Sequence, residues 1–209
     1  MSVRRIMVTL CLGSLVSCLG ACQKTQDAAS GSGGPAAESP VQQRTPTVEL
    51  SDYLPVLDDG RVEIAPPAGW NVLPRGGSHL TRFYKNNRNG LPRIEVKVED
   101  RRYGDISTVT TDNVGKFAER VAAELEERGK RLLEPVIPMV LGEVPCARYV
   151  TLLQLTMGEK TISAERQHLL VLHGGRLYTI DLSVLPATLK QSRDAAYAIC
   201  SGLRFVAGD

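Results

Sequence analysis

Cysteine is the residue type whose placement in this chain points most directly to chemistry, because a thiol can be acylated, oxidised to a disulfide or bound to a metal. Three of the 5 cysteines, Cys11, Cys18 and Cys22, lie within the first 22 residues of the 209-residue chain. The other two, Cys146 and Cys200, lie far apart in the remaining sequence. No CxxC pair is present, so the spacing predicts neither a zinc site nor a dithiol redox motif.

The three N-terminal cysteines belong to a segment that is typical of a secretory signal. Two arginines at residues 4–5 precede an uncharged apolar run over residues 6–21, which is shorter than the about 20 residues that a membrane span needs. The sequence LGAC at residues 19–22 resembles the lipobox of bacterial lipoproteins. This resemblance implies cleavage before Cys22, acylation of the Cys22 thiol and a membrane anchor made of acyl chains.

A second cleavage site remains open four residues earlier. The sequence LVSC at residues 15–18 also fits the lipobox pattern and would make Cys18 the lipidated residue. Cys22 is preferred because Ala21 is smaller than Ser17 beside the cleaved bond, and because the hydrophilic chain starts directly after it. Cys11 and Cys18 are then apolar residues of the discarded signal.

The segment after the signal predicts a tether. Residues 23–46 consist mostly of Ser, Gly, Pro, Ala and Gln and offer too little apolar surface to offset the entropy lost on ordering. Such a flexible linker has a mean span of roughly 25–30 Å. The expected organisation is a signal peptide at 1–21, the lipidated cysteine with its linker at 22–46, and one globular domain at 47–209.

The charge balance argues against nucleic acid as a partner. Lys and Arg number 25 and Asp and Glu number 23, so removal of the two arginines at residues 4–5 leaves no net charge. A neutral chain lacks the basic surface on which nucleic-acid binding depends.

The spacing of apolar residues predicts strands, a helix, further strands and a final helix. The clearest strand is RIEVKVE at 93–99, whose apolar residues are expected in the core and whose charged residues are expected in water. Helical spacing appears at 113–128 and 186–203. Short Gly-containing connections predict antiparallel neighbours, and therefore an α+β fold in which helices pack on an antiparallel β-sheet. The other expected strands are residues 61–66, 70–73, 79–84, 136–142, 147–156, 161–172 and 177–184.

Three local features resemble the PsbP-like α/β/α sandwich. They are PPAGW at residues 66–70, GGRLYTIDLSV at 174–184, and a C-terminal helix that runs into GLRF at 202–205. With the strand order they cover residues 60–206. The resemblance implies a fold found in extrinsic photosynthetic subunits, in a small GTPase-binding protein and in many bacterial lipoproteins. Most of these proteins bind other proteins or stabilise assemblies rather than catalyse reactions, although a fold alone does not transfer function.

Motifs for catalysis or cofactor binding are absent from the sequence. It contains no HExxH, GxSxG or P-loop pattern, so no cofactor is expected. The histidines are His79, His168 and His173. The odd spacing of the last two places them on opposite faces of one strand, so they are not expected to share a metal ion.

Cys146 and Cys200 are the two thiols that remain once Cys22 is lipidated. An exported protein lies in a compartment where disulfides persist. A bridge between the two would tie the last helix to a strand and close a loop of about 54 residues, worth on the order of 4 kcal/mol by the loop-entropy model. Two separate buried thiols remain the alternative, because a bridge requires Cα atoms within about 7 Å.

These features predict a lipoprotein anchored to a membrane of the bacterial cell envelope, which is not an enzyme and presents a binding or assembly surface to a protein partner. Gln23 stands where some bacteria place an aspartate that retains lipoproteins at the inner membrane, so the outer membrane is slightly favoured. The alternative is an envelope hydrolase whose site is assembled from residues distant in sequence. Converging polar side chains with perturbed pKa values would favour the enzyme, and an exposed apolar patch would favour the binding module.

Overall fold

Strands with the predicted alternation of apolar residues pair into one large sheet in the computed structural model, which describes residues 40–157 and 159–206. Among these residues, eight strands form a sheet in the order β1-β6-β7-β8-β9-β5-β4-β3, and β2 pairs separately with β10. The predicted signal peptide, the predicted lipidation site Cys22 and most of the predicted linker lie outside the described residues. The strands are β1 (Gln42–Arg44), β2 (Val62–Glu63), β3 (Asn71–Leu73), β4 (Thr81–Tyr84), β5 (Arg93–Asp100), β6 (Leu132–Leu141), β7 (Val144–Met157), β8 (Lys160–His173), β9 (Arg176–Val184) and β10 (Arg204–Phe205).

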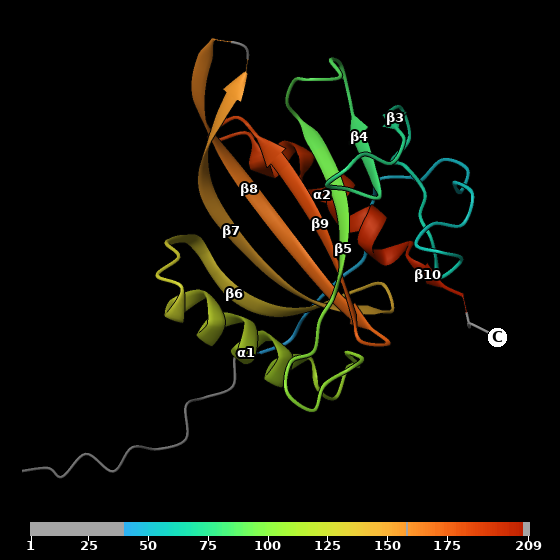
Figure 1. Cartoon of the computed structure of the whole chain (residues 1–209), viewed down its shortest axis with the longest axis vertical. Coiled ribbons are helices and arrows are strands. Elements are labelled where there is room, and N and C mark those ends of the chain that lie inside the picture. Colours follow the sequence, from blue (N-terminus) through green and yellow to red (C-terminus); the bar gives the residue numbers. More distant parts are fainter. Residues whose placement is uncertain (1–39, 158, 207–209) are drawn as a thin grey trace, which may run out of the picture. The chain divides into compact units, whose positions relative to one another are not determined.

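The two helices lie on opposite faces of the sheet (Figure 1). On one face, Phe117 of α1 (Val114–Glu127) packs in an apolar cluster with Leu170 of β8. On the other face, Ile199 of α2 (Leu189–Ser201) packs with apolar side chains of β5, β8 and β9. All neighbouring strands of the large sheet are antiparallel except β1 and β6. The predicted α+β fold with helices packed on an antiparallel sheet is therefore confirmed.

Helix α1 is too short to cover its face of the sheet. Its 14 residues extend about 21 Å at 1.5 Å per residue. Strands β7 and β8 have 14 residues each and extend about 46 Å at 3.3 Å per residue. The helix packs against β6 and β7, and no described helix lies over the middle of β5, β8 and β9 on this face (Figure 1). No helix in the described part of the chain is long and apolar enough to span a membrane.

Strand β1 corrects the prediction that the linker extends to residue 46. Gln42–Arg44 pair in parallel with residues 139–141 of β6, so the last part of that segment belongs to the sheet. Soon after the strand, the Asp194 carboxylate of α2 accepts a hydrogen bond from the backbone N–H of Thr47 at 2.8 Å. All three side chains of β1 are exposed, so backbone pairing holds the strand and no apolar alternation reveals it in the sequence.

Cys146 of β7 and Cys200 of α2 lie side by side in the core between the sheet and α2, and both are fully buried. The structure contains them as free thiols. The hydrogen bond with Cys146, together with burial, holds the pKa of the Cys200 thiol well above its ordinary value. The two thiols are therefore neighbours in the core, and the disulfide itself stays a prediction.

The N-terminal sequence predicts export to an oxidising compartment, so we expect these two neighbouring thiols to form a disulfide when the protein is isolated without reductant. The denatured protein should then take up no alkylating label at Cys146 or Cys200, and its intact mass should lack two hydrogens. Reduction should lower the free energy of unfolding by on the order of 4 kcal/mol. The Cys200→Ala variant, which retains a single buried thiol, is the control. Labelling of both cysteines before reduction would contradict the prediction.

Candidate functional site

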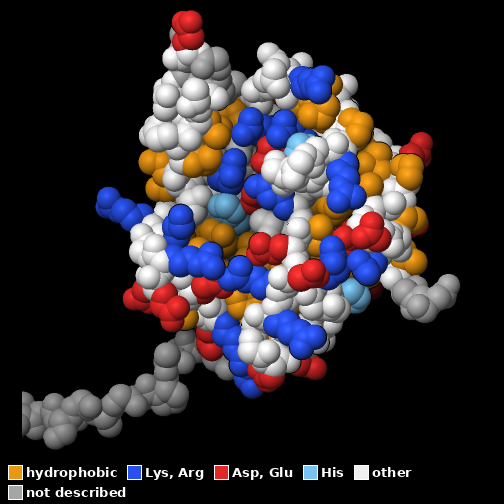
Figure 2. All heavy atoms as spheres, in the orientation of Figure 1, with side chains coloured by type: hydrophobic (Ala, Val, Ile, Leu, Met, Phe, Trp, Pro, Cys, Tyr) orange, Lys and Arg blue, Asp and Glu red, His pale blue; other side chains and the backbone are white. Residues whose placement is uncertain are grey.

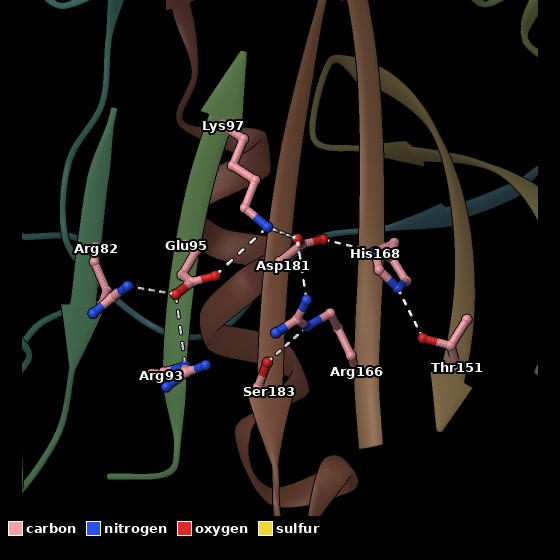
Figure 3. Close-up of polar contacts among 9 residues, drawn as sticks. All are labelled: Arg82, Arg93, Glu95, Lys97, Thr151, Arg166, His168, Asp181 and Ser183. Carbon is pink, nitrogen blue, oxygen red and sulfur yellow. Dashed lines mark hydrogen bonds and ion pairs between the residues drawn. The ribbon is translucent and has the colours of Figure 1, made fainter. Parts of the chain in front are cut away.

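A row of charged side chains crosses the part of the sheet that α1 leaves uncovered. The strand register places Arg82, Glu95, Asp181 and His168 opposite one another on β4, β5, β9 and β8. Residues that are opposite in neighbouring strands point to the same face, so these four side chains form a continuous line, called here the mixed row (Figure 3).

Both carboxylates of the mixed row are buried and paired. Arg82 Nη2 lies 2.8 Å from Glu95 Oε1, and Lys97 Nζ lies 2.7 Å from Asp181 Oδ2. His168 Nδ1 lies 2.7 Å from Asp181 Oδ1. Only 8% of the Glu95 side chain and 4% of the Asp181 side chain are exposed. The two negative charges therefore depend on their protein partners rather than on water.

These partners keep both carboxylates ionised. Burial alone would raise the pKa of Asp181, but the hydrogen bond from His168 and the charge of Lys97 outweigh it and lower the pKa to about 2. Burial likewise opposes ionisation of Glu95, and its cationic neighbours, Arg93 foremost, still hold the pKa below its ordinary value. At neutral pH the mixed row thus contains two permanent negative charges.

His168 is held in one orientation by three neighbours. Because Asp181 is ionised, Nδ1 of His168 carries a hydrogen and donates it to that carboxylate, and Nε2 faces the Thr151 hydroxyl at 3.0 Å. The Tyr149 ring stacks on the imidazole with centroids 4.3 Å apart and planes 17° apart. Tyr149 is opposite His168 in the β7–β8 register and so extends the mixed row by one strand.

A second row lies two residues further along the strands. It consists of Arg93, Ser183, Arg166 and Thr151, opposite one another on β5, β9, β8 and β7, and is called here the basic row. Arg166 Nε donates to Ser183 Oγ at 2.9 Å. The row contains no carboxylate of its own. The nearest acids belong to the mixed row, 3.7 Å from Arg93 Nε and 4.0 Å from Arg166 Nη1.

The basic row carries positive charge that its surroundings do not fully neutralise. The Arg93 and Arg166 side chains are recessed, with 16% and 17% of their surface exposed. Burial lowers the pKa of Arg93; Glu95 opposes this effect, and the charges of Arg82 and Arg166 add to it. Figure 2 shows Lys and Arg side chains gathered over this part of the sheet. Such guanidinium groups suit a carboxylate or phosphate, because their N–H groups form a planar fork.

Hollows elsewhere on the domain offer weaker candidates. One of about 260 Å³ is lined by residues 75–80 and Val98, and another of about 350 Å³ lies beside Arg176 and Tyr178. Next to the second, the buried Asp58 carboxylate accepts hydrogen bonds from Arg176 Nη2 at 2.5 Å and from the Tyr178 hydroxyl at 2.7 Å. These groups satisfy one another and tie a loop to β9. The candidate site is therefore placed at the two rows.

The structure separates the residues that the sequence singled out. His168 and His173 occupy opposite faces of β8: His168 contacts Asp181, whereas His173 stacks on Phe205 with ring centroids 4.1 Å apart. His79 lies in the segment before β4 and lines the hollow of about 260 Å³. In the described part of the chain, no three His, Cys, Asp or Glu side chains are grouped as metal ligands.

The expectation that the charged residues of segment 93–99 face water is wrong for Glu95 and Arg93. Glu95 is 6% exposed and Arg93 is recessed, because β4 and β9 flank β5 and supply cross-strand partners. One signal in the sequence was available. Asp181 stands in the middle of the apolar strand LYTIDLSV, where an acid needs a buried cation to remain charged.

Comparisons with known proteins find only distant structural likenesses. No protein-family model and no curated protein matches the chain. A crystal structure from Bacteroides thetaiotaomicron is 16% identical with a TM-score of 0.45, and the match covers 70% of this chain but only 45% of that one. The PsbP of the cyanobacterium Synechocystis (CyanoP) is 15% identical with a TM-score of 0.39, over 69% of this chain and 86% of CyanoP.

A third similar structure is LpqN, which is described as involved in cell envelope biogenesis of Mycobacterium tuberculosis. It is 14% identical with a TM-score of 0.45, over 70% of this chain and 83% of LpqN. A PsbP is among the three, as the resemblance to the PsbP-like sandwich leads one to expect. At these TM-scores, the likeness carries no argument about what this chain binds.

Replacement of Asp181 with Asn should destabilise the domain in a pH-dependent way. The pKa of Asp181 is about 2 in the fold, against an ordinary 3.8, so its ionisation contributes roughly 2 kcal/mol at neutral pH. This contribution is complete above about pH 4 and is lost as the pH falls towards 2, because the unfolded chain takes up the proton first. We expect the variant to lose about 3–5 kcal/mol at pH 7, since the partly buried Lys97 and His168 lose their ionised partner.

Urea unfolding between pH 2 and pH 7 measures the effect, and the difference between the two proteins should narrow below pH 4. The control is Asp100→Asn, which removes an ion-paired carboxylate whose side chain is 85% exposed. An equal loss of stability at every pH would contradict the assignment of the charge to Asp181.

Proposed function

We propose that this chain is a lipid-anchored binding module of the bacterial cell envelope, which is not an enzyme and holds a negatively charged group of its partner on the basic row. One observation carries the proposal: Arg93 and Arg166 are two recessed guanidinium groups on either side of Ser183, in a row without a carboxylate. Recessed cations of this kind lose hydration, and an anion that reaches them restores the lost interactions.

The pKa shifts support binding rather than acid–base catalysis. A general acid or base works best when its pKa lies near the working pH. The pKa of Asp181 is lowered to about 2, and that of Glu95 is lowered as well. Polar side chains do converge here, as a hydrolase would require, but the shifts move both carboxylates away from proton transfer at neutral pH.

The membrane anchor is the part of the proposal that rests on the sequence LGAC at residues 19–22. We expect Cys22→Ser to release the protein from the membrane fraction, because the acyl chains supply the binding energy. Detergent-phase partitioning and the intact mass of the mature protein measure the change. Cys18→Ser is the matched control and should remain anchored. Release by Cys18→Ser alone would assign the lipid to Cys18 instead.

Loss of either arginine should weaken anion binding. We expect Arg93→Gln and Arg166→Gln each to lower the affinity for a small anion about ten-fold, equivalent to about 1.4 kcal/mol. Calorimetric titration with sulfate, acetate and methyl phosphate at constant ionic strength measures the affinity. Arg88→Gln, in the exposed turn between β4 and β5, is the matched control. The proposal fails if no anion binds at millimolar concentration, or if the control loses as much affinity.

A hydrolase is the second candidate, and one observation favours it. Thr151 Oγ1, His168 and Asp181 form a chain with distances of 3.0 and 2.7 Å, in the order hydroxyl, imidazole, carboxylate that nucleophilic hydrolases use. Asp181 is also bound to Lys97, and the Thr151 hydroxyl is secondary and hindered, so the chain serves better to fix the imidazole. Ester turnover that disappears in Thr151→Val would favour the enzyme.

A further inference from the structure

We infer that the group held by the basic row is a phosphomonoester in its doubly charged form. This inference rests on the proposed function, because it names the chemistry of the ligand at the same site. Three observations support it. The cations in and beside the rows outnumber the carboxylates, N–H groups of the arginines have no acceptor in the described part of the chain, and the arginine side chains are recessed in the sheet.

Ion pairing leaves two positive charges unmatched in the rows. Each carboxylate of the mixed row has a Lys or Arg nitrogen within 2.8 Å, so Arg82 and the adjacent Lys97 account for two of the four cations in and beside the rows. Arg93 and Arg166 remain, and their nearest carboxylate oxygens lie at 3.7 and 4.0 Å, beyond hydrogen-bond distance. A phosphomonoester supplies close to two negative charges at neutral pH, because its second pKa is about 6. A carboxylate or a phosphodiester supplies one.

Free donors in the basic row match an anion with several oxygens. Arg93 Nε is buried and has no hydrogen-bond acceptor among the described residues. Ser183 is fully buried, and its Oγ accepts from Arg166 Nε at 2.9 Å, so it holds that guanidinium in place without reaching a ligand itself. The outer nitrogens of both guanidinium groups add further donors. Two neighbouring guanidinium groups can thus offer several N–H donors to one ligand, which suits the three terminal oxygens of a phosphomonoester better than the two of a carboxylate.

The spacing of the strands sets the size of the group. Neighbouring strands lie about 4.8 Å apart, so the backbones at Arg93 and Arg166 stand roughly 10 Å apart on either side of Ser183. Side chains of Arg93 and Arg166 that point towards each other across this distance would leave room between them for a small tetrahedral anion.

Two sources can present this chemistry: a soluble phosphorylated molecule or a phosphomonoester lipid headgroup. The guanidinium groups are recessed in the middle of the sheet, with about one-sixth of their surface exposed, so the phosphate must protrude from whatever carries it. Both sources must carry a terminal phosphate without a second ester bond. An experiment with soluble and membrane-bound phosphates distinguishes between them.

Calorimetric titration of the unaltered protein at pH 8 tests the inference with four probes: methyl phosphate and sulfate as dianions, dimethyl phosphate and acetate as monoanions. We expect methyl phosphate to bind at a ratio of one per chain and at least about ten-fold more tightly than either monoanion. Equal binding of a monoanion would overturn the inference and leave the proposed function standing. Tighter binding of sulfate would overturn the choice of phosphate, and binding of no anion would overturn both proposals.

Variants locate the binding at the basic row. Arg93→Gln and Arg166→Gln should each abolish the preference for methyl phosphate over dimethyl phosphate, whereas Arg88→Gln should retain it. Ser183→Ala removes the acceptor that holds Arg166 in place without changing the charge and should weaken methyl phosphate binding several-fold. It therefore tests the row even if an arginine variant fails to fold. A preference that survives in a folded arginine variant would contradict the assignment.

Vesicles separate the two sources of the phosphate. Phosphatidylcholine vesicles with phosphatidate present the headgroup phosphomonoester, and vesicles with phosphatidylglycerol present a diester at matched charge. Cosedimentation that requires phosphatidate and Arg93 identifies the lipid source, whereas binding of methyl phosphate without such cosedimentation identifies a soluble one. The inference would be contradicted if the protein cosedimented equally with both lipids, if Arg93→Gln did not change this, and if methyl phosphate did not bind.

Discussion

The arrangement of the sheet depends on one ionised carboxylate near its centre. Asp181 is almost fully buried, and removing an unpaired carboxylate from water costs several kcal/mol. Its partners come from both neighbouring strands, Lys97 from β5 and His168 from β8. A shift of either strand by one residue would turn these partners to the opposite face. The buried charge therefore favours the register that also places Arg93 and Arg166 on either side of Ser183.

One face of the sheet contains both an apolar region beside α1 and a charged region. Along β8, Leu172 and Leu170 pack in the apolar cluster that contains Phe117 of α1, and His168 and Arg166 follow where this cluster ends. Each step of two residues keeps a side chain on this face, so the change from apolar to charged marks the edge of the helix. A helix that covered the whole sheet would require all these positions to be apolar. The short α1 is thus the condition under which a charged site exists here.

The sequence predicted the elements of this fold much better than its site. Alternating strands and apolar helical stripes report which side chains are buried on one face, and the predicted order of strands and helices is the one observed. The rows depend on pairs such as Lys97 and Asp181, which are 84 residues apart and meet only through the strand order β9-β5. Strand β1 escaped prediction for a different reason, because its exposed polar side chains carry no periodic signal.

The edge position of β1 has a mechanical consequence. Any tension on the chain from the N-terminal side reaches the domain at Gln42–Arg44, which backbone pairing with β6 holds in place together with a cation–π contact of Arg44 with Tyr197. Such a short edge strand yields first, and its release adds about 10 Å of extended chain before the load moves on. The next attachment is the Asp194 carboxylate on α2, which holds the backbone of Thr47. We therefore expect the strand to act as a small extensible element that spares the core, and with it the charged rows, from such a pull.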